Sequence, residues 1–418
     1  MVVKEAFEEW NEYAQRKVLL SRDLNLDSII NVSNSKIVAI TGIRRSGKTS
    51  VLMLLAQKLS KKGKKVAYIN LEDSRLRESK DVLDEVLKWF GDDGFLLLDE
   101  VTSADDWQGW LARNHELLKG KLNLIVSSSR KSLIAPNKLL RGRILPFELF
   151  PLSFKEFLEF KGVKVERTTA GKGRLEKAFL EYLKYGGFPE VVLARDEIDK
   201  VRILNAYFKD IVGLDVADIS KMDVSTVETF GRYIVQSPYF SASKCLNFFK
   251  SLGYKIGKEK ILELEKYAEA GYLFFFTPIF SYNIKDRSQY PRKAYCGDLG
   301  FYYSTTGKMD FGRLCENAAF LELRRRVQTG AEICYWKGKT GAEVDLLVKR
   351  GTSATDAVQV VYEAESEETM KREVRGLGEC INELKPTKAL MLTKDISGTK
   401  TVGGAKVQIV TIIDWLLE

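Results

Sequence analysis

The feature that most constrains this chain of 418 residues is a glycine-rich loop at residues 42–49, which reads GIRRSGKT. A short β-branched apolar run at 36–41 comes directly before it and predicts a buried parallel strand. An apolar-periodic segment from Val51 to Leu59 follows and predicts a helix. A strand, a GxxxxGK[ST] loop and a helix in this order are typical of a phosphate-binding loop. We therefore expect a nucleotide site with ATP and Mg²⁺ as its ligands.

The positions of this loop have separate expected roles. Gly42 and Gly47 let the backbone wrap, so that its N–H groups and the helix N-terminus face phosphate. We expect Lys48 to be a solvent-facing ligand of the β- and γ-phosphates, and the Thr49 hydroxyl to bind Mg²⁺. The candidate nucleotide-binding residues of the loop are Gly42, Ile43, Arg44, Arg45, Ser46, Gly47, Lys48, Thr49 and Ser50.

A second apolar run, at residues 95–98, ends in the acidic pair Asp99 and Glu100. We expect Asp99 to hold the Mg²⁺ shell and Glu100 to orient or deprotonate the attacking water. A nucleotide hydrolase needs that second acid, whereas a small-molecule kinase does not. A further strand at 122–126 ends in three serines, of which Ser128 is the candidate sensor of the γ-phosphate. Capping of the segment after it is an equally open role for Ser128.

The alternation of strands and helices across residues 35–165 predicts a doubly wound α/β domain with its site at the strand carboxyl ends. Residues 243–252 and 258–270 then predict two helices around a glycine-containing turn, as in a helix-turn-helix. A strand and a polar loop follow as a wing, whose cations would bind DNA phosphates. Docking within the protein is the alternative, because the second helix is acidic. The wing cations are Lys285, Arg287, Arg292 and Lys293.

The last third has the residue order of the PD-(D/E)xK nuclease fold, in which two carboxylates hold Mg²⁺ and a lysine stabilises the transition-state phosphate. Glu316 on a helix, Asp345 on a strand and Gln359 on the next strand fall in that order. The lysine position, two residues after Gln359, is Val361. We therefore expect a vestigial site that has kept the fold and lost catalysis. Lysines of neighbouring strands that could still reach it are Lys337, Lys339 and Lys349.

Four longer stretches read GIRRSGKTS, FLLLDEVTSADDW, LRGRILPFELFPLSFKEFLEF and YGGFPEVV. With them, nearly the whole chain resembles a large family of prokaryotic, archaeal-type AAA+ ATPases that join a P-loop core and a helical lid to a winged helix and a nuclease-like domain of unknown function. The resemblance implies that Arg143, ahead of Arg141, is a finger or sensor contacting the γ-phosphate in cis or from a neighbouring subunit. It also places Arg22 beside the nucleotide base.

These observations predict four parts: an AAA+ ATPase core at 1–165, a helical lid or linker at 166–222, a winged helix at 223–305 and a PD-(D/E)xK-like α/β domain at 306–418. The expected function is ATP hydrolysis coupled to movement of the winged helix and an inactive nuclease-like domain, acting on DNA. One alternative is a low-turnover nucleotide switch that controls a protein partner. Another is an ATP-gated DNA nuclease. A second copy of the chain is a further candidate partner.

Composition excludes several other classes of protein. No apolar run approaches the roughly 18 residues of a membrane span. The single histidine, His115, leaves neither His-ligated metal chemistry nor a Ser-His-Asp triad, and the five cysteines form no CxxC pair. The net charge of +9 permits nucleic-acid binding without establishing it. We expect a cytoplasmic protein with no membrane partner.

Overall fold

The computed structural model describes residues 2–133, 138–327, 330–362, 367–402 and 404–418. Its contacts group the chain into two compact units, Met1–Leu149 with Ala270–Tyr272, and Phe150–Glu269 with Leu273–Glu418. The first unit therefore ends earlier than the expected core boundary at residue 165. The division of the remaining chain into a lid, a winged helix and a nuclease-like domain stays a prediction.

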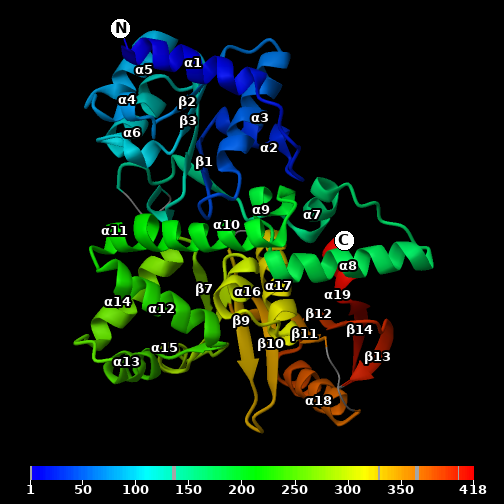
Figure 1. Cartoon of the computed structure of the whole chain (residues 1–418). Helices are drawn as coiled ribbons and strands as arrows, with labels where there is room; N and C mark the ends of the chain where they lie inside the picture. The colour runs from blue at the N-terminus through cyan, green and yellow to red at the C-terminus, as the bar shows by residue number, and fades with distance from the viewer. Residues whose placement is uncertain (1, 134–137, 328–329, 363–366, 403) are drawn as a thin grey trace. The chain divides into compact units, whose positions relative to one another are not determined.

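The first unit is built on a five-stranded parallel sheet, as the sequence predicts (Figure 1). In spatial order its strands are β2 (Val66–Asn70), β3 (Gly94–Asp99), β4 (Leu122–Ser128), β1 (Ile37–Thr41) and β5 (Ile144–Glu148). Its helices are α1 (Val2–Arg16), α2 (Leu26–Ser33), α3 (Lys48–Lys61), α4 (Ser74–Arg77), α5 (Val82–Phe90), η1 (Val101–Ser103), α6 (Trp107–Leu117) and η2 (Lys131–Leu133). This order makes β4 the neighbour of both β1 and β3, so the carboxyl ends of these three strands meet at one edge.

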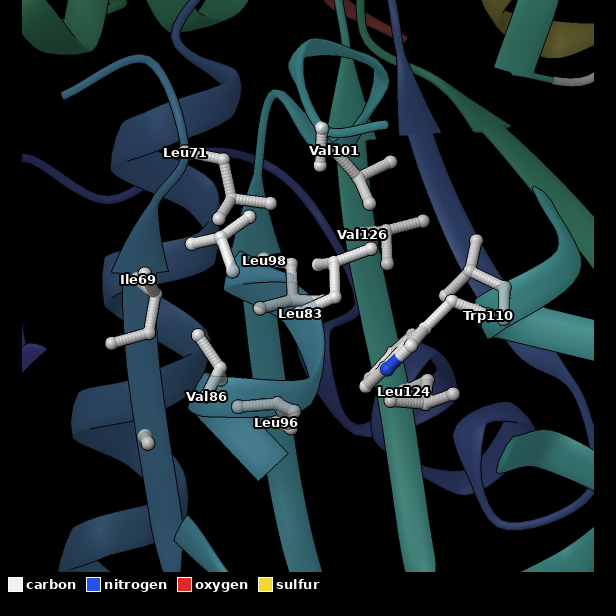
Figure 2. Close-up of a cluster of buried hydrophobic side chains, with 14 of the residues drawn as sticks. Ile69, Leu71, Leu83, Val86, Leu96, Leu98, Val101, Trp110, Leu124 and Val126 are labelled. Atoms are coloured by element: carbon white, nitrogen blue, oxygen red, sulfur yellow. The ribbon is translucent and has the colours of Figure 1, made fainter. Parts of the chain in front are cut away.

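Both faces of this sheet are buried under helices. Ile37 and Ala39 of β1 belong to a cluster with residues of α5 and α6, whereas Val38 and Ile40 belong to a cluster with residues of α2 and α3. Figure 2 shows the first cluster, in which Trp110 of α6 and side chains of α5 lie against β2, β3 and β4. Because successive residues of a strand face opposite ways, covering both faces requires the unbroken apolar runs seen in the sequence.

The elements after Leu149 are mainly helical with two further sheets. The helices are α7 (Phe154–Lys161), α8 (Thr169–Tyr185), α9 (Pro189–Leu193), α10 (Glu197–Asp210), the π-helical η3 (Ile211–Ala217), α11 (Asp218–Ser220), α12 (Val224–Gln236), α13 (Ala242–Ser251), α14 (Lys258–Ala270), α15 (Ile284–Gln289), α16 (Gly300–Thr306), α17 (Phe311–Arg326), α18 (Glu367–Leu384) and α19 (Ile412–Leu417). The strands are β6 (Tyr239–Phe240), β7 (Phe274–Thr277), β8 (Arg292–Cys296), β9 (Ala331–Lys337), β10 (Glu343–Arg350), β11 (Ser353–Val361), β12 (Lys388–Thr393), β13 (Gly398–Val402) and β14 (Ala405–Thr411).

The two helices of the expected helix-turn-helix are present as α13 and α14. The expected wing differs from the prediction in two ways. Its first strand, which the sequence predicts at 272–276, is β7 and begins only at Phe274, because Tyr272 has a left-handed φ of 59°. The polar segment before β8 contains a short helix, α15, in place of an open loop. Strands β6, β8 and β7 form an antiparallel sheet in that order.

A six-stranded sheet carries the last part of the chain, in the order β13-β14-β12-β11-β10-β9. Strands β9 and β10 pair as an antiparallel hairpin, and β11 continues the antiparallel run. Strand β11 also pairs in parallel with β12, and helix α18 lies between these two strands in the chain. Val361 lies in the apolar core of this sheet with Leu377 and Cys380 of α18. No cation therefore stands at the expected lysine position.

Asp298 holds the glycine turn that ends α8. One carboxylate oxygen, Oδ2, accepts the Gly187 N–H at 2.8 Å, and Oδ1 accepts the Gly300 N–H at 2.9 Å. Asp298 is buried, and this burial raises its pKa to about 7, while the two backbone donors act in the opposite direction.

We expect the free energy of unfolding to contain a component from Asp298 that falls as pH rises. Its folded pKa of about 7 lies above the ordinary 3.8, so this stability is complete below pH 3.8 and is lost progressively until pH 7. The expected slope is about 1.4 kcal/mol per pH unit. Urea unfolding from pH 4 to 8 should show this slope in the wild type and not in Asp298→Asn. An identical pH dependence of the two proteins would contradict the prediction.

Candidate active site

The phosphate loop leaves β1 at the carboxyl edge of the sheet and ends where α3 begins. Gly42 has a φ of 153°, and a Cβ there would lie 2.0 Å from the carbonyl oxygen of Leu149. Gly47, with a φ of 100°, comes directly before the first residue of α3. Both positions therefore require glycine, and the free N–H groups of the first turn of α3 lie at the loop.

Lys48 lies under the loop, which corrects the expectation of a solvent-facing side chain. Its side chain is only 5% exposed, and its Nζ donates to the carbonyl oxygens of Gly42 at 3.1 Å and Ile43 at 3.2 Å. The Nζ is also 3.7 Å from Oε1 of Glu100. The loop curls over the ammonium, which donates to two loop carbonyls and forms an ion pair with one carboxylate.

The middle of the loop contains Ser46 and two arginines. Ser46 Oγ is buried and has no hydrogen-bond partner among the residues that the structure describes. Arg22 donates from Nη1 to the Ser46 carbonyl oxygen at 2.8 Å, so the structure brings it to the phosphate loop. Its contact with a nucleotide base stays a prediction. Arg44 lies 3.6 Å from Glu72, and Arg45 has a left-handed φ of 71°.

These observations fit a nucleotide phosphate. A hydroxyl donor without a partner, a lysine ammonium and the positive end of α3 all belong to one loop. Ser50 follows Thr49 in the first turn of the same helix.

Asp99 is buried and accepts three side-chain hydrogen bonds. Thr49 Oγ1 donates to Oδ2 at 2.6 Å, Tyr68 donates to the same oxygen at 2.8 Å, and Ser127 Oγ donates to Oδ1. Burial and the nearby Glu100 raise the pKa of Asp99, while these three hydroxyls act in the opposite direction. Thr49 and Asp99 were both expected at Mg²⁺ from the sequence, whereas no sequence signal pointed to Tyr68 or Ser127. Only the strand register, which pairs Leu98 with Val126, reveals that Ser127 lies level with Asp99.

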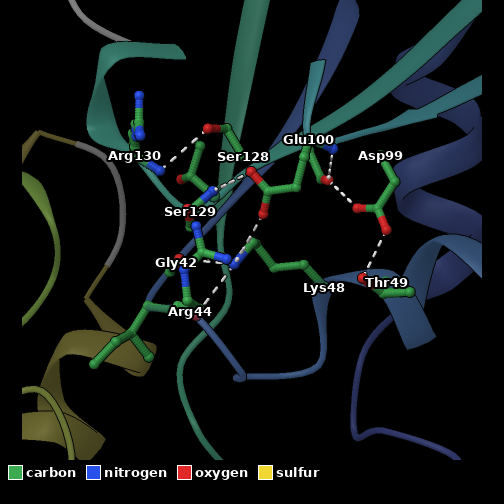
Figure 3. A network of polar contacts seen from close by, with 12 residues as sticks. Gly42, Arg44, Lys48, Thr49, Asp99, Glu100, Ser128, Ser129 and Arg130 are labelled. Atoms are coloured by element: carbon green, nitrogen blue, oxygen red, sulfur yellow. Dashed lines mark hydrogen bonds and ion pairs between the residues drawn. The ribbon is translucent and has the colours of Figure 1, made fainter. Parts of the chain in front are cut away.

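Glu100 stands in a left-handed conformation, with φ and ψ both 50°. This conformation is uncommon outside glycine. Two contacts stabilise it: the Glu100 N–H donates to Ser127 Oγ at 3.0 Å, and the Ser129 N–H donates to Glu100 Oε2 at 3.0 Å. The carboxylate consequently points toward Lys48 (Figure 3). Residues of β1, α3, β3 and β4 thus converge on one polar centre.

The Ser128 hydroxyl is used within the loop that follows β4. Its Oγ lies 2.9 Å from Thr102 Oγ1 and accepts the Arg130 N–H at 3.1 Å. This closes a turn between β4 and η2, and an N-cap role of Ser128 stays a prediction. A contact between Ser128 and the γ-phosphate stays a prediction.

The fold does not bring Arg143 to the phosphate loop of its own chain. Arg143 precedes β5, and its carbonyl oxygen accepts the Ile37 N–H at the amino end of β1. The loop lies beyond Thr41, at the opposite end of that strand. The Arg143 guanidinium donates to Glu116 Oε2 and to the Leu139 carbonyl oxygen. A finger role in cis therefore conflicts with the fold, and a role toward a neighbouring subunit stays a prediction.

Known protein families match three segments of the chain. An AAA domain covers residues 34–158, a domain of unknown function (DUF8612) covers 176–311, and another (DUF4143) covers 311–409. An uncharacterized protein of Methanocaldococcus jannaschii is 32% identical over 385 residues, which are 90% of this chain and 84% of that protein. The chain belongs to this AAA-type ATPase family.

Two other similarities extend over much of the chain. An uncharacterized protein of Haemophilus influenzae is 26% identical over 419 residues, covering 96% of this chain and all of that protein. The AMPPCP-bound structure of DnaA from Aquifex aeolicus is 19% identical, covers 58% of this chain and 85% of that chain, and has a TM-score of 0.28. The family assignment rests on the AAA domain and the archaeal relative.

The expected wing of this AAA-type ATPase is not a free basic surface. Arg287 is paired with Glu332, Arg292 is paired with Glu265, and Lys293 is buried among carboxylates. Of the four cations assigned to DNA phosphates, Lys285 alone is exposed. The assignment of Lys293 to a phosphate is therefore wrong, because this side chain is buried among acidic side chains of the same unit. Phosphate contacts of Arg287 and Arg292, which are partly exposed, stay a prediction.

The vestigial nuclease residues are only partly brought together. Glu316 and Asp345 both contact the Nζ of Lys293. Gln359 lies beside them, but its Oε1 accepts the Asp345 N–H at 3.2 Å and its Nε2 donates to Glu373 at 2.8 Å. A lysine is thus present at the carboxylates, although the sequence predicts none on β11 and suggests only Lys337, Lys339 and Lys349 as substitutes. Lys349 is instead 3.0 Å from Glu332.

The described part of the chain contains neither a metal-binding cluster nor a membrane-spanning helix. No group of three or more His, Cys, Asp or Glu side chains there is arranged to hold a metal ion. No described helix has the length and apolar character needed to span a membrane.

Proposed function

We propose that this AAA-type ATPase hydrolyses ATP at the phosphate loop and uses the nucleotide cycle to move the rest of the chain on DNA. The observation that carries the proposal is the convergence of Lys48 and Glu100, 3.7 Å apart, next to the pair of Thr49 and Asp99. A phosphate-binding cation and an acid able to activate water are the two groups that phosphoanhydride hydrolysis needs.

The residues divide this chemistry between them. Lys48 and the N–H groups of the loop would bind the phosphates, and Glu100 would take a proton from the attacking water. Thr49 and Asp99 would hold Mg²⁺, which when bound offsets phosphate charge. An arginine finger would come from a second copy of the chain. The exposed pair of Arg143 and Glu116 supports this, because such pairs contribute only about 0–1 kcal/mol and are easily exchanged.

The names given to the other parts also belong to this proposal. Helices α12 to α14 with the sheet β6-β8-β7 support a winged helix. Helix α17, the run β9-β10-β11 and the parallel partner β12 reached through α18 support a PD-(D/E)xK-like domain. The net charge of +9 supports DNA as the partner.

A second candidate function is a low-turnover nucleotide switch that controls a protein partner. It is favoured by the ion pairs of Arg287, Arg292 and Lys293, which leave the expected wing with little free positive charge. The two candidates differ in whether DNA or a protein partner should change the rate of ATP hydrolysis.

The deciding experiment is an ATPase assay with and without single-stranded, duplex and branched DNA at two salt concentrations. If the protein acts on DNA, DNA should raise the turnover of ATP, and the effect should weaken at higher salt because counterions are released on binding. Turnover that ignores DNA, together with no DNA binding at low salt, would contradict the DNA proposal and favour the switch. A protein that hydrolyses no ATP, with or without DNA and at either salt concentration, would contradict both candidate functions.

A further inference from the structure

The ε-ammonium of Lys293 lies between three carboxylates. Its Nζ is 2.9 Å from Glu316 Oε1, 2.9 Å from Glu343 Oε1 and 2.8 Å from Asp345 Oδ1. The Lys293 side chain is only 5% exposed. A lysine ammonium has three N–H donors and no acceptor. The Nζ donates hydrogen bonds to Glu316 and Asp345 and forms an ion pair with Glu343, so carboxylates surround the ammonium.

Strand periodicity explains why these groups meet. Lys293 and Tyr295 are two residues apart on β8, and Glu343 and Asp345 are two residues apart on β10. Residues with this spacing share a face of a strand. Helix α17 adds Glu316. The pairing of β10 with β9 shifts register between Val344 and Leu347, next to Asp345.

The carboxylates have further donors of their own. Tyr295 donates to Glu316 Oε1 at 2.7 Å, and Tyr239 of β6 donates to Glu343 Oε1. The Val360 N–H of β11 donates to Asp345 Oδ2 at 3.0 Å. Since one ammonium cannot neutralise three carboxylates, these donors stabilise the remaining negative charge.

Electrostatics keep the lysine charged. Burial by itself lowers the pKa of Lys293, but Asp345 and Glu316, followed by Tyr295 and Glu343, outweigh it and hold the pKa well above its ordinary value. Burial raises the pKa of Glu316, which Lys293 opposes. A buried charge persists only when it is paired in this way.

We propose that the Lys293 ammonium is the built-in cation of this carboxylate centre, where it replaces a divalent metal ion and fastens β8 to α17 and β10. The Asn317 side chain adds to this fastening, because it bonds both the N–H and the carbonyl oxygen of Cys296 on β8. The inference goes beyond ATP hydrolysis. It makes the C-terminal centre a metal-free junction between the three-stranded sheet and the C-terminal sheet.

Manganese titration of the full-length, nucleotide-free protein tests the metal part of the proposal. Any Mn²⁺ site of the wild type should still be present in Asp345→Asn. Lys293→Met should gain one such site, because it vacates a position lined by three carboxylates, and Lys293→Met/Asp345→Asn should lose it again. The matched control is Lys349→Met, which removes a lysine of β10 outside the centre and should gain no site.

Thermal unfolding gives an independent readout of the same variants. Lys293→Met should lower Tm by about 5–15 °C, since removing one partner of a buried ion pair leaves unpaired charge. Added Mn²⁺ should raise the Tm of Lys293→Met through the new site. In the wild type, any Mn²⁺-dependent shift of Tm should be the same as in Asp345→Asn.

Two results would overturn the proposal. One is a Mn²⁺ site in the wild type that disappears in Asp345→Asn. The other is Mn²⁺-dependent cutting of linear or branched DNA by the wild type that both Asp345→Asn and Lys293→Met abolish, which would make Lys293 a nuclease lysine. If Lys293→Met does not fold, the wild-type titration and the cleavage assay still decide, because a Mn²⁺ site or Mn²⁺-dependent cutting that Asp345→Asn alone removes would already overturn a metal-free centre.

Discussion

Lys48→Ala should abolish ATP turnover, with kcat/KM reduced by at least about 10²–10³-fold, the scale for losing one preorganised donor to developing negative charge. The loss should be at the upper end of that scale, because the lysine also fixes the loop. Its Nζ bonds the carbonyl oxygens of Gly42 and Ile43 and lies 3.7 Å from Glu100. The variant removes the phosphate ligand, the brace of the loop and the cation facing the acid at once.

The measurement is ATP hydrolysis together with nucleotide binding, with the fold followed by circular dichroism. The matched control is Lys58→Ala on the same helix. Lys58 lies far along α3 from the loop, and its partly exposed ammonium pairs with Asp27 of α2. This control should keep wild-type turnover. Because Lys48 is buried, a small loss of stability is expected, but β1 and α3 should persist through their own apolar contacts. Wild-type turnover in Lys48→Ala would refute the phosphate-loop assignment.

Glu100→Gln should keep nucleotide affinity and slow hydrolysis by roughly 10²–10⁴-fold, as expected for losing a general base. A glutamine can still accept the Ser129 N–H that now bonds Glu100 Oε2, so the side chain keeps its place. What disappears is the carboxylate that can take a proton and that faces Lys48.

Asp99→Asn should give a different defect, a weaker binding of the Mg²⁺–nucleotide complex. The aspartate accepts hydroxyl hydrogen bonds on both oxygens, from Thr49 and Tyr68 on one and from Ser127 on the other. An amide offers one acceptor oxygen and places an NH₂ group against the remaining hydroxyls. Equilibrium binding of a fluorescent nucleotide with and without Mg²⁺ separates the two variants. The same defect in both would show that the division of roles is wrong.

Local signals were sufficient for the ATP site. The loop needs glycine at 42 and 47, and the structure has left-handed or sterically closed backbone at both. Apolar runs predicted β1, β3 and β4, because a parallel sheet covered on both faces permits little else. The roles expected of Thr49 and Asp99 at one Mg²⁺ ion agree with the hydrogen bond between them, although β4 separates β1 from β3 in the sheet.

The local sequence did not predict the register of the strands or the direction of individual side chains. The choice between Ser127 and Ser128 depends on which serine of β4 lies level with Asp99, and pairing across strands decides that. The burial of Lys48 depends on how the loop curls. Arg143 is close to the core motifs in sequence, but the direction of β5 places it at the opposite end of the sheet.

By itself, then, the sequence determined the phosphate loop, its acidic partner and the order of strands and helices, since each depends on residues next to one another in the chain. The tertiary structure alone decided what Lys293 does. In sequence it belongs to a basic loop, and its partner Asp345 is 52 residues away. Folding buries it against three carboxylates, and a buried ammonium is stable only where such partners surround it. Partners that distant become neighbours through the packing of β8, α17 and β10, which no local pattern encodes.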